Sequence, residues 1–167
     1  MTTAVLVTPV GRLRVRTTDL GLADIGWTTA PPTPPSTHDI VAQLQEYFRG
    51  ERRRFDVPID WGRTAGVQRE ILETLYATVD YGSAITYGEL AARSGTGIPA
   101  RGIGSVMGSN PIPIVVPCHR VVAADGLGGY SGGTVRNHLE VKRWLLTMEG
   151  ALPPTLDWDP DGIALIG

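Results

Sequence analysis

The segment Ile114–Val122 restricts the fold of this 167-residue chain more than any other. It holds the only cysteine, Cys118, between two runs of β-branched apolar residues. Such runs favour burial in extended structure, and Pro117, which lacks a backbone N–H, favours a bend just before the thiol. The sequence therefore predicts a bend and a strand over residues 111–122, with Cys118 deep inside.

The two residues after Cys118 are possible chemical partners for the thiol. His119 can act as a base and Arg120 is a positive neighbour, and both would favour the thiolate, which is the nucleophilic form. The alternative is a buried structural cysteine, the commonest fate of a single cysteine. This segment alone leaves both interpretations open.

Composition excludes several classes of protein. A single cysteine rules out an internal disulfide and a multi-cysteine zinc site, and His38, His119 and His138 are too scattered to predict a metal site. The chain contains no apolar run of about eighteen residues and no signal-peptide pattern at its start. We therefore expect a cytoplasmic protein without a membrane segment.

The first part of the chain predicts a small sheet with one helix. Residues 4–27 alternate as strands, and the proline-rich connector at 30–36 separates them from an amphipathic helix between Ile40 and Gly50. Phe55–Trp61 then predicts an edge strand.

From residue 62 onward the pattern is mostly helical. Apolar residues from Val67 to Leu75 predict one helix. Thr86 and Glu89 form a capping box that starts a second, short helix, and Pro99 suits the first position of a third helix that ends near Gly108. Two short helices joined by a tight glycine-containing turn make a helix-turn-helix.

A last amphipathic helix ends at Gly150. The sequence thus predicts an α+β protein with two domains. Residues 1–61 would form an N-terminal sheet-plus-helix domain, and residues 62–167 a mostly helical domain that carries the helix-turn-helix.

The second helix of the predicted helix-turn-helix is unusually thin. Ala100, Gly104, Ser105 and Gly108 are small, and Arg101 is its one long side chain. Such a helix cannot read base edges across a major groove, but it suits close approach to a narrow groove. The alternative is tight packing between helices, which explains the glycines but not the arginine.

The net charge of −2 does not indicate nucleic-acid binding, but its distribution is informative. Residues 90–145 contain six basic residues against two acids. These bases could face phosphates, although an ordinary solvated surface is the alternative. They are Arg93, Arg101, Arg120, Arg136, Lys142 and Arg143.

Several motifs in order resemble the O6-alkylguanine-DNA alkyltransferase family. Pro117–Val121 matches closely, Arg101 and Asn110–Pro111 precede it at the family's spacing, and Gly129–Gly133 follows. The resemblance covers residues 64–150 well and the earlier part loosely. It implies direct reversal of DNA alkylation: an alkyl group moves from guanine O6 in double-stranded DNA to the cysteine sulfur, once per molecule and without a cofactor.

The resemblance also implies the catalytic roles. Cys118 would accept the alkyl group, His119 would take the thiol proton through a water, and Glu149 would orient the histidine. Tyr87 would donate to the departing base. Asn110 would tie the bend before the cysteine to the helix-turn-helix.

Further roles concern DNA and the flipped base. Arg101 would replace the extruded nucleotide in the stack while its helix enters the minor groove. Further DNA contacts are expected from Ala100, Gly104, Ser105, Arg93 and Arg120. The flipped base is expected to contact Tyr87, Val121, Tyr130 and Ser131. The segment 134–139 is slightly longer than the corresponding segment usual in the family.

Three alternative functions are weighed against this one. A damage-binding protein without transfer activity would lack the cysteine, whereas this chain has Cys118. A cysteine hydrolase could use Cys118, His119 and Glu149, but it gives no reason for Arg101 on a thin helix. A DNA-binding regulator would need longer side chains on that helix. We therefore expect a monomeric DNA repair protein.

Overall fold

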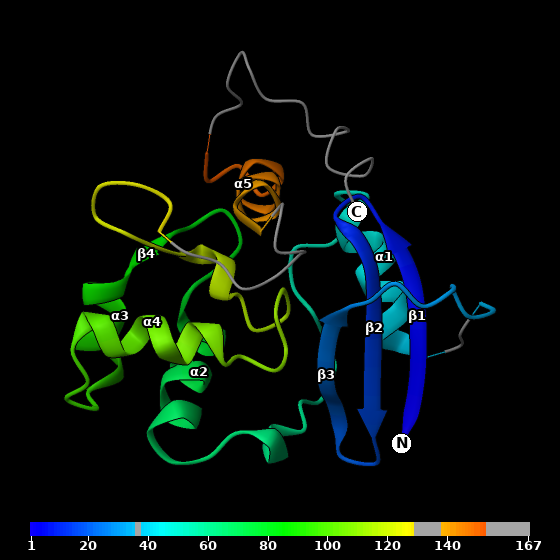
Figure 1. Ribbon diagram of the computed structural model, residues 1–167, viewed down its shortest axis with the longest axis horizontal. Helices are drawn as coiled ribbons and strands as arrows, with labels where there is room; N and C mark the ends of the chain where they lie inside the picture. Colours follow the sequence, from blue (N-terminus) through cyan, green and yellow to red (C-terminus); the bar gives the residue numbers. More distant parts are fainter. Residues whose placement is uncertain (36–37, 129–137, 153–167) are drawn as a thin grey trace.

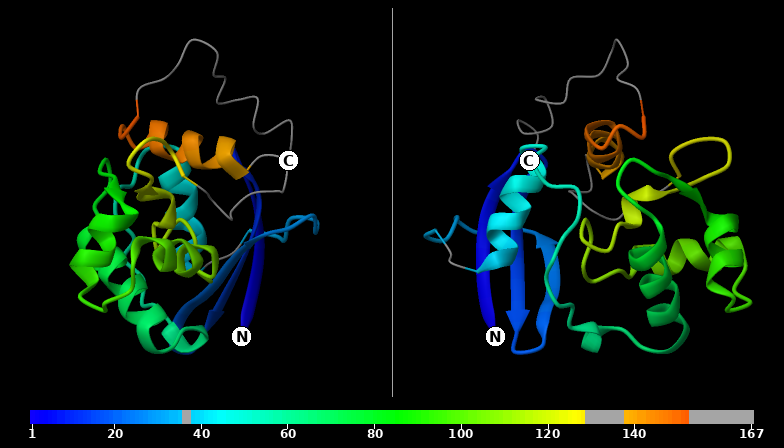
Figure 2. Two further views of the ribbon diagram at one scale, coloured as in Figure 1. Left: turned by 60° about the vertical axis from the view of Figure 1, so that its left-hand side comes forward. Right: turned by 180° about the vertical axis from the view of Figure 1, so that it is seen from behind.

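The computed structural model describes residues 1–35, 38–128 and 138–152, which form a mixed α+β fold (Figure 1). Three antiparallel strands come first, in the order β1-β2-β3. Helix α1 packs against one face of this sheet (Figure 2). These elements are β1 (Thr2–Thr8), β2 (Gly11–Thr18), β3 (Gly21–Trp27) and α1 (Asp39–Phe48).

Alternation along β2 explains how the sheet is oriented. Leu13 and Val15 are buried, whereas Arg12, Arg14 and Arg16 between and beside them remain partly or fully exposed. A strand places successive side chains on opposite faces, so the apolar set of β2 faces the core and the arginines face outward. The predicted strands and helix of the first part are confirmed.

The edge strand predicted over Phe55–Trp61 is wrong. Within this segment only Ile59 bridges β3, opposite Leu22. Proline has no N–H to donate, and Pro58 contributes its carbonyl alone, which accepts from the Leu22 amide at 2.9 Å. The segment continues into a short 3-10 helix, η1 (Trp61–Arg63).

The second half is mostly helical and wraps around the segment that holds Cys118 (Figure 1). A two-stranded parallel pair links the start of the helix-turn-helix to the residues after the cysteine. The elements are α2 (Gly66–Thr78), β4 (Ile85–Thr86), α3 (Tyr87–Ser94), α4 (Ala100–Gly108), η2 (Cys118–Arg120), β5 (Val121–Val122) and α5 (His138–Met148).

The predicted helix-turn-helix is confirmed in α3 and α4. The Thr86 hydroxyl accepts from the Glu89 amide at 3.1 Å, and the Glu89 carboxylate accepts from the Thr86 amide at 3.3 Å, which completes the capping box. Gly95 ends α3 with a φ of 66°, a left-handed conformation that glycine adopts without steric cost. Pro99 caps α4 rather than opening it, one residue from its predicted position.

The two halves share one hydrophobic core. Buried side chains from the sheet, α1, α2, α4, α5 and the residues before Cys118 form a single cluster. The Ile25 amide of β3 also donates to the Pro111 carbonyl at 3.0 Å, which attaches the sheet edge to the second half. Among the described residues, no helix is both long and apolar enough to cross a bilayer.

Candidate active site and DNA-binding surface

Asn110 holds the chain in a bend between α4 and the cysteine. Its side-chain amide donates to the Val116 carbonyl at 2.8 Å, and its side-chain oxygen accepts from the Ile112 amide at 3.0 Å. Ile114 within this bend has a φ of 76°, a conformation that costs a β-branched residue on the order of 1–3 kcal/mol. The bend therefore depends on the surrounding hydrogen bonds, and the two from Asn110 lie within the bend itself.

Cys118 begins the 3-10 helix η2 and does not lie on a strand, contrary to the prediction. Its amide donates to the Val116 carbonyl at 2.8 Å, and the Arg120 amide donates to the Pro117 carbonyl at 2.9 Å. These short-range hydrogen bonds tighten the backbone into a turn. Extended structure starts only at Val121, where β5 pairs with β4.

The thiol of Cys118 is buried, with 3% of the residue exposed. Burial raises the pKa of Cys118 to about 11, although a hydrogen bond from Asn110 and the charge of Lys142 act in the opposite direction. The thiol is therefore protonated at neutral pH. Desolvation thus outweighs the groups that favour the thiolate. A base must remove the proton during reaction.

His119, the base predicted from the sequence, is held in place by Glu149. Its Nε2 lies 2.8 Å from Oε2 of Glu149, and both side chains are fully buried. Because the carboxylate can only accept, Nε2 carries the proton and Nδ1 is left as the basic atom. Burial lowers the pKa of His119, which keeps the imidazole neutral. No described protein group bonds Nδ1.

Glu149 is ionised despite its burial. Desolvation by itself would raise its pKa, but the contacts with His119 and Arg120 outweigh it and lower the pKa to about 2. Arg120 donates from Nε to Oε1 at 2.8 Å and from Nη2 to Oε2 at 3.1 Å. The Glu149 carboxylate thus orients His119, while Arg120 compensates its negative charge.

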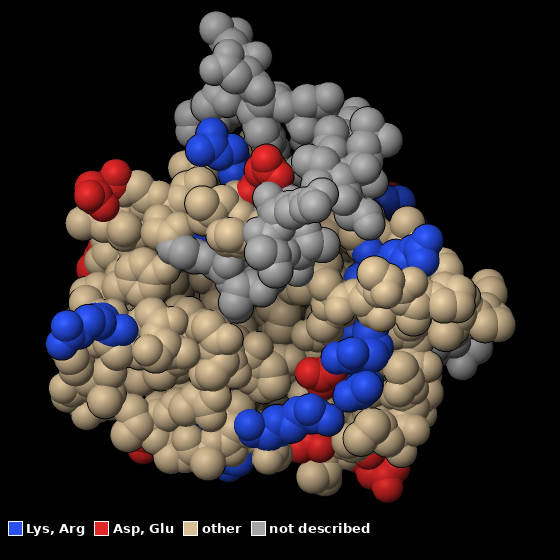
Figure 3. Space-filling model, viewed as in Figure 1, with Lys and Arg blue, Asp and Glu red and all other residues tan. Residues whose placement is uncertain are grey.

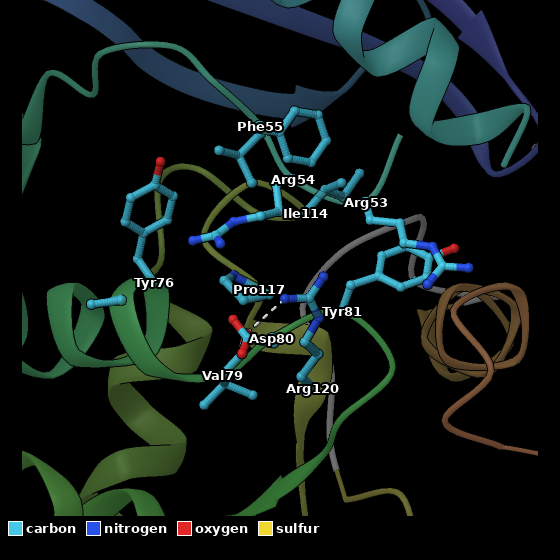
Figure 4. A pocket seen from close by; sticks show the side chains of 12 residues that line it. Arg53, Arg54, Phe55, Tyr76, Val79, Asp80, Tyr81, Ile114, Pro117 and Arg120 are labelled. Atoms are coloured by element: carbon cyan, nitrogen blue, oxygen red, sulfur yellow. Dashed lines mark hydrogen bonds between the residues drawn. The ribbon is translucent and has the colours of Figure 1, made fainter. Parts of the chain in front are cut away.

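Arg120 does not fit the predicted DNA contact. Only 7% of it is exposed, and its third nitrogen donates to the Val79 carbonyl at 2.8 Å (Figure 4). A guanidinium committed to a buried carboxylate and a carbonyl is not available to a phosphate. The structure assigns Arg120 to the interior instead.

A cavity of about 180 Å³ lies beside this arginine, between the two halves (Figure 4). Its lining includes Arg54, Tyr81, Pro117 and Arg120, but not Cys118. The cavity therefore lies next to Arg120, the residue of η2 that binds the Glu149 carboxylate, and does not open onto the thiol.

Lys142 is a site residue that sequence reasoning missed. It was grouped with the bases that could face phosphates, yet it is fully buried and its Nζ donates to the Val121 carbonyl at 2.7 Å. Burial lowers its pKa to about 8, and the charge of Cys118 acts against that shift. The helical period was the available signal, because Leu145 and Leu146 follow at i+3 and i+4 on the buried face.

Tyr87 lies next to this group as the first residue of α3. Its ring centroid is 5.9 Å from the Lys142 ammonium nitrogen. A Cβ on Gly128 would come within 2.8 Å of the Tyr87 hydroxyl, so the glycine allows the chain to pass close to the phenol. The β4–β5 pairing sets Ile85 opposite Val121 and so brings α3 beside the cysteine segment.

The remaining residues predicted to contact the base cannot be placed in the same way. Tyr130 and Ser131, and most of the slightly long stretch 134–139, lie outside the described residues. Among the described residues, no group of three or more histidine, cysteine, aspartate or glutamate side chains could hold a metal ion.

The outer face of α4 is formed by its small residues. Ile103 and Met107 are buried, whereas the opposite face is exposed and contains Ala100, Arg101, Gly104, Ser105 and Gly108. A Cβ built on Gly104 or Gly108 would meet no described atom within 4 Å. Packing between helices, the alternative explanation for the glycines, therefore does not account for these two.

The predicted excess of basic residues does not form one phosphate-facing surface. Arg120 and Lys142 are buried, and Arg136 lies outside the described residues. Arg93 is exposed and donates to the Thr78 carbonyl at 3.4 Å, and Arg101 is exposed on α4. Figure 3 shows few charged side chains over α3 and α4, and most of the basic ones on this face gather over the sheet.

Comparison with known proteins gives concordant matches. A family model described as the DNA binding domain of 6-O-methylguanine DNA methyltransferase matches residues 66–151. A methylated-DNA–protein-cysteine methyltransferase of Methanopyrus kandleri is 44% identical, over 72% of this chain and 90% of its own length. The mouse protein of the same name is 34% identical, over 98% and 87%. The crystal structure of Mycobacterium tuberculosis OGT in complex with DNA is 34% identical, with a TM-score of 0.77 and 98% of each chain covered.

Proposed function

The chain belongs to the O6-methylguanine-DNA methyltransferase family, whose members repair DNA by direct reversal, and we propose that its acceptor is Cys118 and its substrate O6-alkylguanine in duplex DNA. One observation supports this most strongly. The buried thiol of Cys118 begins the same 3-10 helix as His119, whose imidazole is held at 2.8 Å by the ionised Glu149. A structural cysteine would not need this arrangement.

The chemistry follows from these groups. Nδ1 of His119 takes the thiol proton through a water, and the sulfur attacks the alkyl carbon. The carbon–O6 bond breaks and its electron pair stays on the guanine, where Tyr87 donates to the base and offsets the developing negative charge. The ammonium of Lys142 stabilises the transient thiolate. The thioether is stable, so each molecule reacts once.

DNA binding is proposed to use α4 and base flipping. O6 lies within the base stack, so the nucleotide must leave the duplex to reach a buried sulfur. The thin outer face of α4 suits the minor groove, and Arg101 would occupy the vacated position in the stack. Val121, Tyr130 and Ser131 would contact the flipped base, and Arg93 a phosphate.

The organisation of the protein is part of the proposal. We infer an N-terminal domain over residues 1–61 and a C-terminal DNA-binding and transfer domain over residues 62–167. The chain would act as a monomer, and its single cysteine suits the reducing cytoplasm.

Stoichiometry tests this function. A fixed amount of protein is mixed with an excess of duplex DNA that contains O6-methylguanine, and the methylated base is quantified over time. We expect loss of one methylguanine per protein, after which the reaction stops. Continued turnover would indicate a hydrolase, and binding without loss of methylguanine would indicate a damage-binding protein.

Tyr87→Phe tests the donor to the departing base. The variant keeps the ring beside Lys142 but removes the hydroxyl, so the charge that develops on guanine loses a hydrogen bond. Because a hydrogen bond to a charged group contributes about 1.5–3 kcal/mol, transfer should slow by roughly ten- to a hundredfold. Single-turnover rates measure this change, and thermal unfolding checks the fold. An unchanged rate would end the donor role.

Gly104→Ala separates helix stability from DNA binding. The methyl group enters open space on α4, and alanine favours a helix interior over glycine by up to about 1 kcal/mol. The variant should therefore be more stable and yet bind duplex DNA more weakly, and Gly104→Val should bind more weakly still. Unfolding and fluorescence anisotropy titrations measure the two effects. Undiminished affinity in both variants would exclude α4 as the helix that enters the groove.

A further inference from the structure

Glu149 receives a hydrogen bond from the N-terminal half of the protein. The hydroxyl of Tyr47, the penultimate residue of α1, donates to Oε2 of Glu149 at 2.5 Å. Both side chains are buried, and 102 positions separate them in the sequence. Tyr47 also lies outside residues 66–151, the part that matches the DNA-binding domain model.

The sequence predicts only that Tyr47 packs in the hydrophobic core. It falls at helical spacing with Ile40 and Leu44 on the buried face of α1. Its ring does pack in the core, with centroids 5.2 Å from Phe48 and 5.3 Å from Phe55. A phenylalanine would supply that packing equally well, so the hydroxyl and its acceptor need a separate explanation.

We propose that Tyr47 is a positioning residue for alkyl transfer, which fixes the Glu149 carboxylate that orients His119. The inference rests on the proposed function of that pair. It gives the N-terminal half a part in positioning the catalytic groups, beyond that of a scaffold.

The geometry of Oε2 supports this role. This one oxygen accepts from the Tyr47 hydroxyl, from Nε2 of His119 and from Nη2 of Arg120. Burial and the neighbouring Glu149 raise the pKa of Tyr47 well above its ordinary value, so the phenol remains a donor. Three donors on one oxygen leave the carboxylate little freedom to rotate away from the imidazole.

Removal of the hydroxyl has a predictable electrostatic direction. A carboxylate with one donor fewer is more basic and attracts a protonated imidazole more strongly, so the pKa of His119 should rise. The other charged groups that act on His119 stay in place in the variant: Arg120 beside it and Lys142 on α5. Tyr81, which also interacts electrostatically with Glu149, is likewise retained in the variant.

Tyr47→Phe is the test, with Tyr76→Phe on α2 as the matched control. Tyr76 is half-buried, and its ring packs against Trp61. Single-turnover transfer should slow roughly tenfold for Tyr47→Phe, as expected for loss of a hydrogen bond to a charged group. The midpoint of the acid limb of its pH–rate profile should move to higher pH. Tyr76→Phe should change neither, and duplex affinity should stay the same in both.

A double-mutant cycle distinguishes positioning from packing. If Tyr47 acts through Glu149, Tyr47→Phe should slow transfer in the wild-type background but cause no further loss in Glu149→Gln. Equal losses in both backgrounds, or a loss that follows the unfolded fraction without a shift in the pH profile, would leave Tyr47 as a core residue only.

Nuclear magnetic resonance of the His119 imidazole without DNA keeps this test independent of the proposed function. In wild-type protein Nε2 should carry the proton, and in Tyr47→Phe the imidazole should titrate at higher pH. An identical titration in the two proteins would overturn the inference. Absence of methyl transfer in the wild type would overturn the proposed function instead.

Discussion

Cys118→Ser should abolish methyl transfer and leave duplex binding intact. A serine hydroxyl does not ionise in the range where His119 can accept its proton, so no nucleophile forms. The substitution is close to isosteric, and the side chain is almost fully buried, so the 3-10 helix and the bend held by Asn110 should persist. The loss of transfer should be complete, which makes this the largest effect expected in the protein.

Two measurements on the same preparation test this prediction. Transfer is followed by loss of O6-methylguanine from duplex DNA, and binding by fluorescence anisotropy. Cys118→Ala serves as a second variant without any hydroxyl. If both variants lose DNA binding and thermal stability together with transfer, Cys118 has a structural role and the chemical assignment is wrong.

Arg101→Ala should impair repair of duplex DNA far more than reaction with a free O6-alkylguanine base. The side chain is exposed at the start of α4, so its loss disturbs little of the fold. In a duplex the vacated position must be filled to hold the base outside the stack, and unstacking costs a few kcal/mol. Loss of that support corresponds to roughly a tenfold to several hundredfold slower repair.

Arg93→Ala is the matched control for this variant. Arg93 is also an exposed arginine of the helix-turn-helix, on α3, but it is proposed to contact only the backbone of DNA. Arg93→Ala should weaken DNA binding and reduce the salt dependence of that binding. It should not lower repair of duplex DNA relative to reaction with the free base. Equal losses of Arg101→Ala on duplex and on free base would remove the role of Arg101 in base flipping.

Local patterns predicted the elements of the fold well. The alternation in β2, the capping box at Thr86 and the glycine after α3 each act within a few residues, so the sequence alone specifies them. The edge strand predicted over Phe55–Trp61 did not form, because its pairing with β3 is limited to the bridge between Ile59 and Leu22. The Pro58 carbonyl faces β3, but this residue has no N–H with which to extend the pairing.

The candidate site was predicted through motifs, and its electrostatics were not. His119 and Glu149 are close in space, as the resemblance implied, and Tyr87 lies beside the cysteine segment. The sequence could not show that desolvation keeps Cys118 protonated or that Arg120 faces inward. Both depend on burial by segments that are distant along the chain.

Lys142 and Tyr47 were missed for different reasons. Lys142 could have been found from the buried side of the α5 helical period, had charge not been taken as a sign of exposure. Tyr47 could not have been linked to Glu149, because the contact spans 102 positions and joins the two halves. Long-range hydrogen bonds of this kind leave no local pattern.

Intact-mass measurement shows directly whether Cys118 accepts the alkyl group. The protein is mixed with duplex DNA that contains O6-methylguanine, and a digest locates any added group. We predict a gain of one methyl group per molecule, confined to the peptide with Cys118 and saturating at that value. An unchanged mass, or a methyl group on another residue, would contradict it.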